Sequence, residues 1–218
     1  MLPIALMADE PKLVRDEERM IKHIIFDLGN VLVNIHPKEV MEEFKHLCKK
    51  NKDKVAEFFL SKFHYDYMSG KYSSDEFYQK LNDTFQFGLD FPDFVSIWNK
   101  VIGKPKDGIE DVVLKLNSNF ILSICSNTDP LHWNFCVQNY PFISDFKHYF
   151  LSFDLGLRKP DKRIFQDMIE RLGTTPNKCL FVDDTYENII TADEMGFFTI
   201  HATNPGAVYA GLDQLKLF

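Results

Sequence analysis

The chain has 218 residues, of which 45% are hydrophobic and 26% are charged, and its formal net charge is −7. This composition is typical of a globular protein with enough apolar residues for one large domain or two modest ones. The negative charge and the lack of a basic block argue against nucleic-acid binding, which depends on Lys and Arg side chains that neutralise phosphates.

Residues 1–20 combine a short apolar stretch with several acids and have no basic start, so we interpret them as an N-terminal extension and not as a signal peptide. No apolar run has the length that crossing a bilayer requires. The cysteines form no CxxC pair, which favours a reducing compartment and argues against a zinc site. We therefore expect a cytoplasmic protein with no membrane partner, and no sequence feature indicates its oligomeric state. The four cysteines are Cys48, Cys125, Cys136 and Cys179.

The first predicted strand is the apolar run at residues 23–26, which ends at a single carboxylate, Asp27. A glycine, Gly29, follows two positions later. An acid directly after a buried strand is often a turn or helix cap, so the position alone does not identify a site.

Residues 36–104 are rich in helix formers with apolar residues at helical spacing, and they predict a small helical bundle inserted after the first strand. Four stretches carry this pattern: residues 39–50, 54–63, 75–81 and 91–102. Ser73 and Glu76 predict a capping box at the start of the third stretch. An insertion beside the end of a strand would act as a lid, and its aromatic stretch at residues 63–68 either lines the site or packs in the bundle.

Four further apolar runs, each short and bounded by polar residues, predict the remaining strands. They are residues 120–125, 148–153, 179–182 and 197–202. Helical patterns separate them, including one that begins at Asp161 and ends at Gly173 and one over residues 187–196 with Ile190 on its apolar face. This alternation predicts a doubly wound parallel sheet in an α/β domain formed by residues 21–35 and 105–218.

Three of these strands end in polar residues. The first ends at Asp27, the run at residues 120–125 ends at Ser126 and Asn127, and the run at residues 179–182 ends at Asp183 and Asp184. Ligands of open parallel sheets bind beyond the carboxyl ends of the strands. The pattern therefore predicts that these polar side chains share one rim of the sheet.

Four motifs in order, FDLGNVL, SNT, LGLRKPDKRIF and FVDDTYENIITADEMGF, resemble those of the haloacid dehalogenase superfamily. The resemblance runs from about residue 21 to the C-terminus, and the helical insertion is similar to the C1-type cap of that family. FDLGNVL, SNTDPLH and DLGLRKP look closest to its glucose-1-phosphate phosphatase-like branch. The resemblance implies a Mg²⁺-dependent phosphatase that hydrolyses a small phosphorylated metabolite, with a sugar phosphate favoured, through an aspartyl-phosphate intermediate.

By this resemblance, Asp27 is the nucleophile, because a carboxylate that attacks phosphorus divides hydrolysis into two easier steps. Asp27, the backbone carbonyl of Gly29, and Asp184 would hold Mg²⁺, and Asp183 would do so directly or through water. Two adjacent carboxylates repel each other unless a cation lies between them, and Mg²⁺ prefers oxygen ligands.

The resemblance also assigns the groups that bind the phosphoryl oxygens. Ser126 and Asn127 would supply a hydroxyl and backbone N–H groups. Lys159 would balance the charge of the phosphoryl group during transfer. Taken alone, a Ser-Asn pair is usually a turn and a lone lysine is usually a surface residue, so the order of the motifs carries these assignments.

Many phosphatases of this superfamily have a second Asp at the position of Gly29, and that Asp protonates the leaving oxygen. Losing a general acid typically costs about 10²–10⁴-fold in rate. We therefore expect either a substrate with a good leaving group, such as an anomeric sugar 1-phosphate, or a proton supplied by His36 or His64.

Two alternatives follow from the same residues. Dehalogenases of the superfamily also lack the second Asp, but they usually replace the acidic pair that this chain has as Asp183 and Asp184, which favours a phosphatase. A catalytically weak regulatory or binding protein is the other alternative, and Gly29 is its main support.

Overall fold

The computed structural model describes residues 21–217, so the predicted N-terminal extension at residues 1–20 lies outside the described residues. Five strands form one parallel sheet in the order β5-β4-β1-β6-β7. The strands are β1 (His23–Phe26), β4 (Ile121–Ser126), β5 (His148–Leu151), β6 (Cys179–Asp183) and β7 (Phe198–His201). All five predicted strands are present, and β1 is the middle strand.

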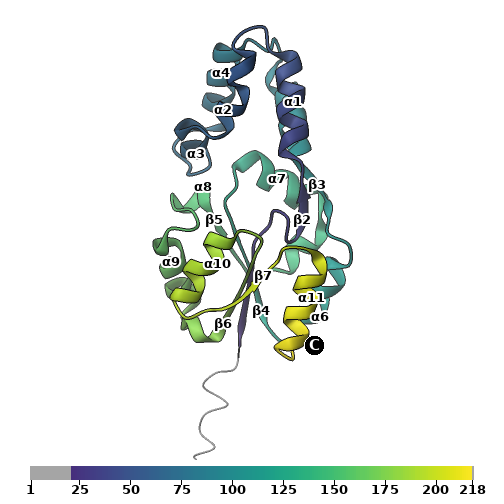
Figure 1. Ribbon diagram of the computed structural model, residues 1–218, viewed down its shortest axis with the longest axis vertical. Coiled ribbons are helices and arrows are strands. Elements are labelled where there is room, and N and C mark those ends of the chain that lie inside the picture. Colours follow the sequence, from purple (N-terminus) through teal and green to yellow (C-terminus); the bar gives the residue numbers. More distant parts are fainter. Residues whose placement is uncertain (1–20, 218) are drawn as a thin grey trace, which may run out of the picture.

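Helices cover both faces of the sheet, as a doubly wound fold requires (Figure 1). One face packs against α6 (Ile109–Asn117), α7 (Pro130–Asn139) and α11 (Pro205–Gln214). The other packs against α8 (Ser152–Leu155), α9 (Lys162–Leu172) and α10 (Tyr186–Glu194). Because both faces are covered, β1 is buried along its whole length, which explains its continuous apolar sequence. The predicted α/β fold is confirmed.

The helix boundaries agree with the capping residues. The side chain of Asp161 accepts a hydrogen bond from the Arg163 N–H at the start of α9, and Gly173 ends that helix at a φ of 58°. One prediction for α10 was wrong, because Ile190 is 40% exposed and does not lie on the buried face.

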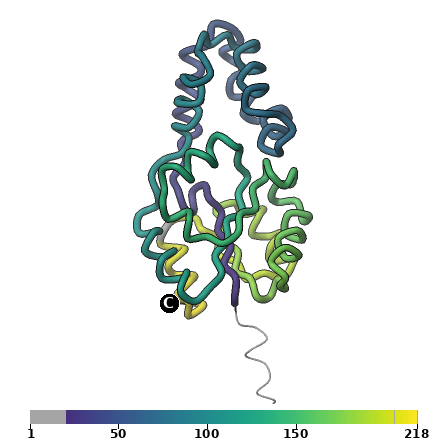
Figure 2. The backbone as a smooth tube through the Cα atoms, turned by 180° about the vertical axis from the view of Figure 1, so that it is seen from behind, coloured from purple at the N-terminus to yellow at the C-terminus, as the bar shows by residue number. Residues whose placement is uncertain are grey.

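Five α-helices between residues 37 and 98 project from one end of the sheet (Figures 1 and 2). They are α1 (Pro37–Leu47), α2 (Val55–Phe59), α3 (Lys62–Tyr67), α4 (Ser74–Phe85) and α5 (Phe91–Trp98). A separate hydrophobic cluster holds them together, and the capping box of Ser73 and Glu76 begins α4 as predicted. We call these helices the cap and the rest the core; the predicted boundaries at residues 36 and 104 stay a prediction.

Two short antiparallel strands connect the cap to the core: β2 (Val33–Ile35) and β3 (Ile102–Pro105). A second contact lies on the other side of the cap, where α3 approaches α8 (Figure 1). There the Ser152 hydroxyl donates to the Met68 carbonyl over 2.6 Å, and the Arg158 guanidinium lies 4.3 Å from the centroid of the Tyr65 ring. The cap therefore contacts the core through these residues as well as through the two connecting strands.

Three predicted boundaries were wrong. The helix expected over residues 54–63 is divided into α2 and α3, because Leu60 is exposed and Ser61 caps a new helix. The helix expected over residues 91–102 ends at Trp98, and a 3₁₀ turn leads from it into β3. The strand expected over residues 148–153 ends at Leu151, because the buried Ser152 hydroxyl bonds the Thr128 and Met68 carbonyls and the chain turns into α8.

None of the helices between residues 21 and 217 combines the length and the hydrophobicity that crossing a bilayer requires.

Candidate active site

The sheet brings together three polar strand ends that are far apart in sequence. β1 lies between β4 and β6, and in this register Phe26 is level with Ile124 and Val182. Asp27 therefore lies next to the ends of both neighbouring strands, where Ser126 and Asp183 are found. One carboxylate oxygen from each of Asp27, Asp183 and Asp184 lies within 4.8 Å of the other two.

Lys159 enters this cluster from the loop before α9, and its side chain is only 1% exposed. Its ammonium group donates to Asp27 Oδ1 over 2.7 Å, to Asp183 Oδ2 over 2.6 Å and to the Cys125 carbonyl over 2.7 Å. The three protons of the ammonium group therefore all have protein acceptors. The arrangement fixes the orientation of the Asp27 carboxylate.

The two adjacent acids have different surroundings. Both oxygens of Asp183 are engaged, because Lys159 donates to Oδ2 while the Thr185 N–H and the Asn188 amide each donate to Oδ1 over 2.9 Å. Asp184 is less buried and accepts two hydrogen bonds, from the Asn30 amide over 3.0 Å and from the Thr185 hydroxyl over 3.3 Å. Asp183 is thus the residue that positions Lys159, and Asp184 is the acid with capacity for a further ligand.

Three carboxylates share one ammonium group, so the cluster lacks positive charge. Burial raises the pKa of Asp27 to about 7; the charges of Asp183 and Asp184 add to this rise, and Lys159 opposes it. Burial by itself lowers the pKa of Lys159, but the carboxylates of Asp27 and Asp183 outweigh it and hold that pKa above its ordinary value. A divalent cation among these oxygens would supply the missing charge.

Oxygen atoms suited to such a cation are present. Asp27 Oδ2 and the Gly29 carbonyl accept no hydrogen bond from any group within residues 21–217, and Asp184 lies beside them at the same rim. Carboxylate and carbonyl oxygens are the ligands that Mg²⁺ prefers. The donor set formed by Asp27, Gly29 and Asp184 therefore fits this ion.

The backbone does not require a glycine at position 29. Its φ lies outside the left-handed region, and an added Cβ would have only ordinary contacts, with Ile35 Cγ2 at 3.4 Å and Ile35 Cδ1 at 3.6 Å. A side chain would fit there. The turn therefore does not explain the glycine, and the effect of Gly29 is that the site has no side-chain group at this position.

Ser126 and Asn127 lie at the same rim but have different surroundings. Ser126 is buried, and its hydroxyl has no hydrogen-bond partner among the described residues. The Asn127 side chain instead makes two bonds of 2.9 Å to the backbone N–H and carbonyl of Lys159. The Asn127 amide thus fixes the loop that carries Lys159.

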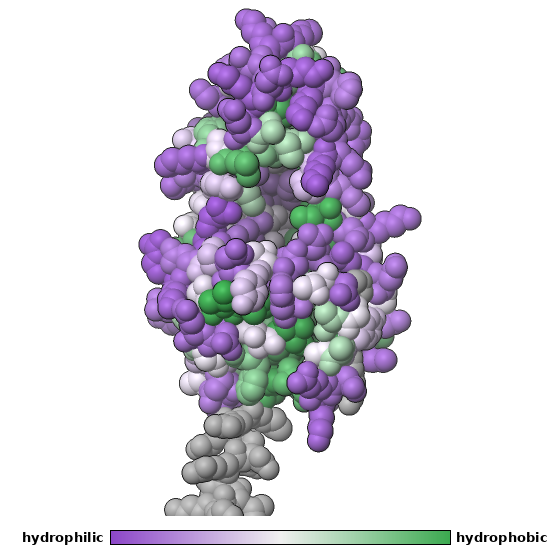
Figure 3. All heavy atoms as spheres, viewed as in Figure 1, coloured by the Kyte–Doolittle hydropathy of each residue, from purple (hydrophilic) through white to green (hydrophobic). Residues whose placement is uncertain are grey.

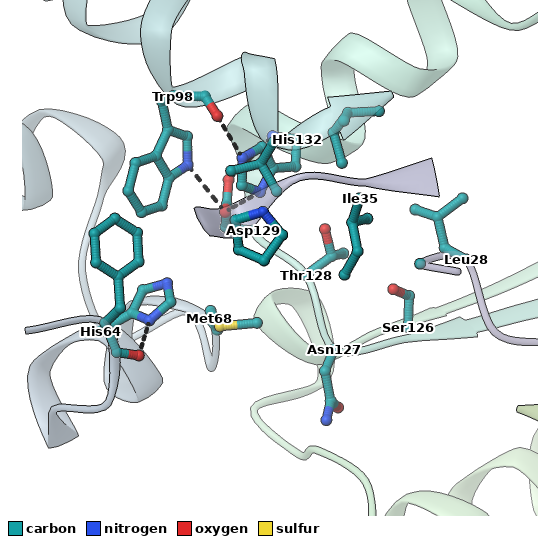
Figure 4. Close-up of a pocket in the computed structure, with 15 residues that line it drawn as sticks. Leu28, Ile35, His64, Met68, Trp98, Ser126, Asn127, Thr128, Asp129 and His132 are labelled. Atoms are coloured by element: carbon teal, nitrogen blue, oxygen red, sulfur yellow. Dashed lines mark hydrogen bonds and ion pairs between the residues drawn. The ribbon is translucent and has the colours of Figure 1, made fainter. Parts of the chain in front are cut away.

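Two cavities meet at this rim. The polar cavity, about 190 Å³ in volume, is lined by the charged cluster, including Asp27, Lys159 and Asp184. The apolar cavity, about 160 Å³, lies between the core and the cap (Figure 4). Four residues line both cavities, so the two are adjacent: Gly29, Ile35, Ser126 and Asn127. In the space-filling view the surface is hollowed where the cap meets the core (Figure 3).

The two histidines proposed as proton donors differ in position. His36 lines neither cavity; it lies at the start of α1, and its Nδ1 is 3.6 Å from Glu39 Oε1. His64 lines the apolar cavity, and its Nδ1 bonds the Phe59 carbonyl over 2.9 Å. From the aromatic stretch at residues 63–68, His64 and Met68 line this cavity, whereas Phe63 and Tyr67 pack in the cap.

The sequence reasoning missed a buried polar network beside the apolar cavity (Figure 4). The carboxylate of Asp129 accepts from Trp98 Nε1 over 3.2 Å and lies 2.7 Å from His132 Nδ1. His132 Nε2 lies 2.9 Å from the Trp98 carbonyl. Both ring nitrogens therefore face acceptors, which favours the imidazolium form. Burial lowers the pKa of His132, but Asp129 outweighs that effect and raises it. His132 thereby links α7 to the cap helix α5.

Some of the missed residues had a weak signal. Asp129 precedes Pro130 and caps α7, a pattern that predicts a helix start but no ion pair. Asn30 and Asn188 hold the two acids, yet an Asn after a glycine or inside a helix gives no such indication.

Comparisons with known proteins agree with this geometry. The sequence profile of the family described as haloacid dehalogenase-like hydrolase matches residues 21–196. The D-ribitol-5-phosphate phosphatase of Bacteroides thetaiotaomicron is 29% identical over 192 residues, which is 85% of this chain and 93% of that protein. The sesquiterpene phosphatase astK of Aspergillus oryzae is 24% identical over 198 residues, or 89% of this chain and 96% of that protein.

The solved structures to which this chain is similar include a haloacid dehalogenase family enzyme of Bacteroides thetaiotaomicron in complex with magnesium and inorganic phosphate. It has a TM-score of 0.75, is 27% identical, and the alignment covers 82% of this chain and 92% of that chain. An L-2-haloacid dehalogenase of Xanthobacter autotrophicus, 18% identical with a TM-score of 0.59 over 91% of this chain and 85% of that chain, shares the fold.

Proposed function

This chain belongs to the haloacid dehalogenase-like hydrolases, and we propose that it is a Mg²⁺-dependent phosphatase that acts on a small phosphorylated metabolite. The observation that carries the proposal is the carboxylate of Asp27, which Lys159 holds at Oδ1 while Oδ2 faces no described donor. Two of its relatives, at 29% and 24% identity, are phosphatases, which supports the same reaction class.

In the proposed reaction, Asp27 Oδ2 attacks the phosphorus of a phosphate monoester. The bond from phosphorus to the ester oxygen breaks, and the leaving group departs with that electron pair. A water molecule then attacks the aspartyl-phosphate, which restores the Asp27 carboxylate and releases inorganic phosphate. Ser126, whose hydroxyl has no described partner, is suited to donate to a phosphoryl oxygen.

Mg²⁺, held by Asp27, the Gly29 carbonyl and Asp184, would supply positive charge to the phosphoryl oxygens. Asp183 is saturated by its own hydrogen bonds, so we assign it to positioning Lys159. Lys159 in turn orients Asp27 and offsets part of the negative charge of the site. The Asn127 side chain fixes the Lys159 loop, which leaves its backbone for the predicted contact with phosphate.

A phosphatase agrees with the site better than a dehalogenase does. Dehalogenation needs no metal, and three carboxylates around one lysine would be left with uncompensated charge. A phosphatase uses those carboxylates to hold a cation. The same excess of carboxylates argues against an inactive binding protein, which would gain stability by losing them.

The test is turnover of acetyl phosphate, whose small acyl group needs no specific pocket, with Mg²⁺ and with EDTA. We expect hydrolysis that requires Mg²⁺ and that Asp27→Asn lowers by at least about 10³-fold. The matched control is Asp193→Asn, an exposed carboxylate on α10, which keeps full activity. Acid-quenched enzyme should carry phosphate on the peptide that contains Asp27. Turnover that persists in Asp27→Asn, or no turnover at all, would contradict the proposal.

A further inference from the structure

The apolar cavity continues directly from the place where a phosphoryl group would be bound. It shares Gly29 and Ser126 with the polar cavity, and the missing side chain at Gly29 leaves the passage between the two unobstructed. A phosphate ester attacked by Asp27 would extend its leaving group along this line. The residues that line the apolar cavity therefore indicate the chemical class of that leaving group.

The walls are mostly hydrocarbon. Leu28 and Ile35 come from the core side, and Phe59, Met68 and Trp98 come from the cap side. Figure 4 shows Leu28, Ile35, Met68 and Trp98 around the same space. Its volume of about 160 Å³ is close to that of an engineered apolar cavity that binds benzene. The space thus suits one six-membered ring.

Most polar side chains in the wall are already engaged with protein partners. Both oxygens of Asp129 and both nitrogens of His132 make hydrogen bonds inside the buried network, and the Asn127 amide bonds Lys159. Apart from the Ser126 hydroxyl, which faces the phosphoryl site as well, two groups of this lining have no described partner for a ligand to displace: the Thr128 hydroxyl and His64 Nε2. A polyol of the same size would bury several hydroxyls without partners, at a cost of roughly tenfold or more in affinity for each.

The lining also lacks a strong proton donor for the leaving oxygen. Position 29 has no carboxyl group, and Ile35 occupies the neighbouring space. His64 donates its Nδ1 proton to the Phe59 carbonyl, so in the neutral ring Nε2 is an acceptor. Burial lowers the pKa of His64 and so favours that neutral form. A leaving group that departs as a stable anion needs no such donor.

On the basis of the proposed phosphatase function, we propose that the apolar cavity binds the leaving group of the substrate. The leaving group would be a compact apolar ring bearing an acidic hydroxyl, as in an aryl phosphate. Leu28, Ile35, Met68 and Trp98 would contact the ring. The Thr128 hydroxyl would donate or accept one hydrogen bond with a substituent, and His64 Nε2 would accept one.

Calorimetric binding in the presence of Mg²⁺ tests the cavity without any turnover. The probes are benzylphosphonate, which presents a ring to the cavity, and methylphosphonate, which does not. Burying one phenyl ring should make benzylphosphonate bind about 10- to 100-fold more tightly. Equal affinity for the two phosphonates would overturn the proposal, whether or not the enzyme hydrolyses acetyl phosphate.

A pair of variants locates the effect. Met68→Gln keeps the length of the side chain but places an amide in the wall, and it should reduce the preference for benzylphosphonate by about tenfold. Leu60→Gln makes a comparable change on the cap at a side chain that is 73% exposed, and it should leave the preference intact. An unchanged preference in Met68→Gln would place the ring elsewhere and overturn the assignment.

Turnover tests the acidic hydroxyl. Phenyl phosphate and cyclohexyl phosphate have rings of similar size, but phenolate is by far the better leaving group. We expect phenyl phosphate to exceed both cyclohexyl phosphate and D-glucose 1-phosphate in kcat/KM by about 10²-fold or more. A higher kcat/KM for the sugar phosphate would overturn this proposal and leave the phosphatase function standing. A failure with acetyl phosphate would instead contradict the phosphatase function.

Discussion

The rim of the sheet and the cap helices meet at one site but are built in opposite ways. At the rim, charged or polar side chains lie at the ends of β1, β4 and β6, and hydrogen bonds hold several of them in place, as in the three bonds that Lys159 donates. In the cap, aromatic rings pack against each other, as Tyr67 and Phe77 do with centroids 3.9 Å apart and planes 11° from parallel. The rim therefore carries directional chemistry, and the cap supplies a shaped hydrocarbon surface.

This difference between rim and cap indicates that one part of the chain sets the reaction and another sets the substrate selectivity. Strand register fixes the rim to within hydrogen-bond distances, so a change there should alter the reaction or the stability of the charged cluster. The cap contacts the leaving group through packing, so a change there should alter which substrate binds. Four substitutions test this separation, from the largest expected effect to the smallest.

Lys159→Gln should have the largest effect on stability. The substitution removes the one ammonium group among three carboxylates, and breaking a buried ion pair typically costs about 3–5 kcal/mol. Urea unfolding in EDTA should show this loss, and added Mg²⁺ should recover part of it. Lys162→Gln, which breaks an exposed ion pair with Glu194, should change the free energy of unfolding by less than about 1 kcal/mol. Equal losses in the two variants would contradict the charge balance described above.

Gly29→Asp should change the reaction while leaving the fold intact. The added Cβ has ordinary contacts with Ile35, and the new carboxyl group would supply a general acid. For cyclohexyl phosphate, which has a poor leaving group, we expect a rise of about 10²-fold in kcat and a new dependence on an acid in the pH–rate profile. Gly29→Asn fills the same space and supplies no acid, so it should show neither change. Identical profiles for the Asp and Asn variants would remove the argument from the missing carboxyl group.

Gly70→Ala tests the second contact between cap and core. A Cβ at position 70 would lie 2.0 Å from the Phe153 carbonyl oxygen, and its φ of 72° disfavours a side chain. The matched control is Gly173→Ala, which has a φ of 58° but no atom within 4 Å of the added Cβ. We expect Gly70→Ala to lower the free energy of unfolding by about 2–3 kcal/mol and the control by about 1 kcal/mol. Similar losses would mean that backbone strain alone sets the cost.

His132→Gln should have the smallest effect, seen as a change in how stability varies with pH. Asp129 raises the folded-state pKa of His132, so the contribution of the cation is fully present below its unfolded pKa of about 6.5 and is lost as the pH rises through the folded value. The net pKa of Asp129 is lowered: burial raises it, and His132 outweighs burial. Its contribution is therefore present above about pH 3.9 and is lost as the pH falls through the folded value.

The measurement is the urea concentration at the midpoint of unfolding, followed from about pH 5 to 9. This range spans the pKa of an unperturbed histidine, about 6.5. The midpoint of the wild type should fall more steeply on the alkaline side than that of His132→Gln. His46→Gln, an exposed histidine on α1, should follow the wild type. If the midpoint of His132→Gln varies with pH as steeply as that of the wild type, the ion pair of His132 and Asp129 does not contribute to the pH dependence of stability.

Much of the core could be predicted from local sequence. The uninterrupted apolar run of β1, the N-cap Asp161 and the C-terminal Gly173 of α9 each follow from chemistry within a few residues. The gathering of polar groups at one rim also followed, because parallel strands end at the same edge of a sheet. The cap was predicted less well: the break at Leu60 and Ser61 lies inside a continuous helical pattern.

The sequence by itself determined which elements form, which side chains end the strands and that an acid is missing at Gly29. Only the tertiary structure decided that Asp183 is fully buried and bound to Lys159, that His132 pairs with Asp129 and bonds the Trp98 carbonyl, and that hydrocarbon surrounds the space beyond the phosphoryl site. The physical reason is range. Strand formation and capping depend on neighbours along the chain. The buried ion pairs and the cavity lining depend on distant partners, such as Trp98 and His132, 34 positions apart, and Asp27 and Lys159, 132 positions apart.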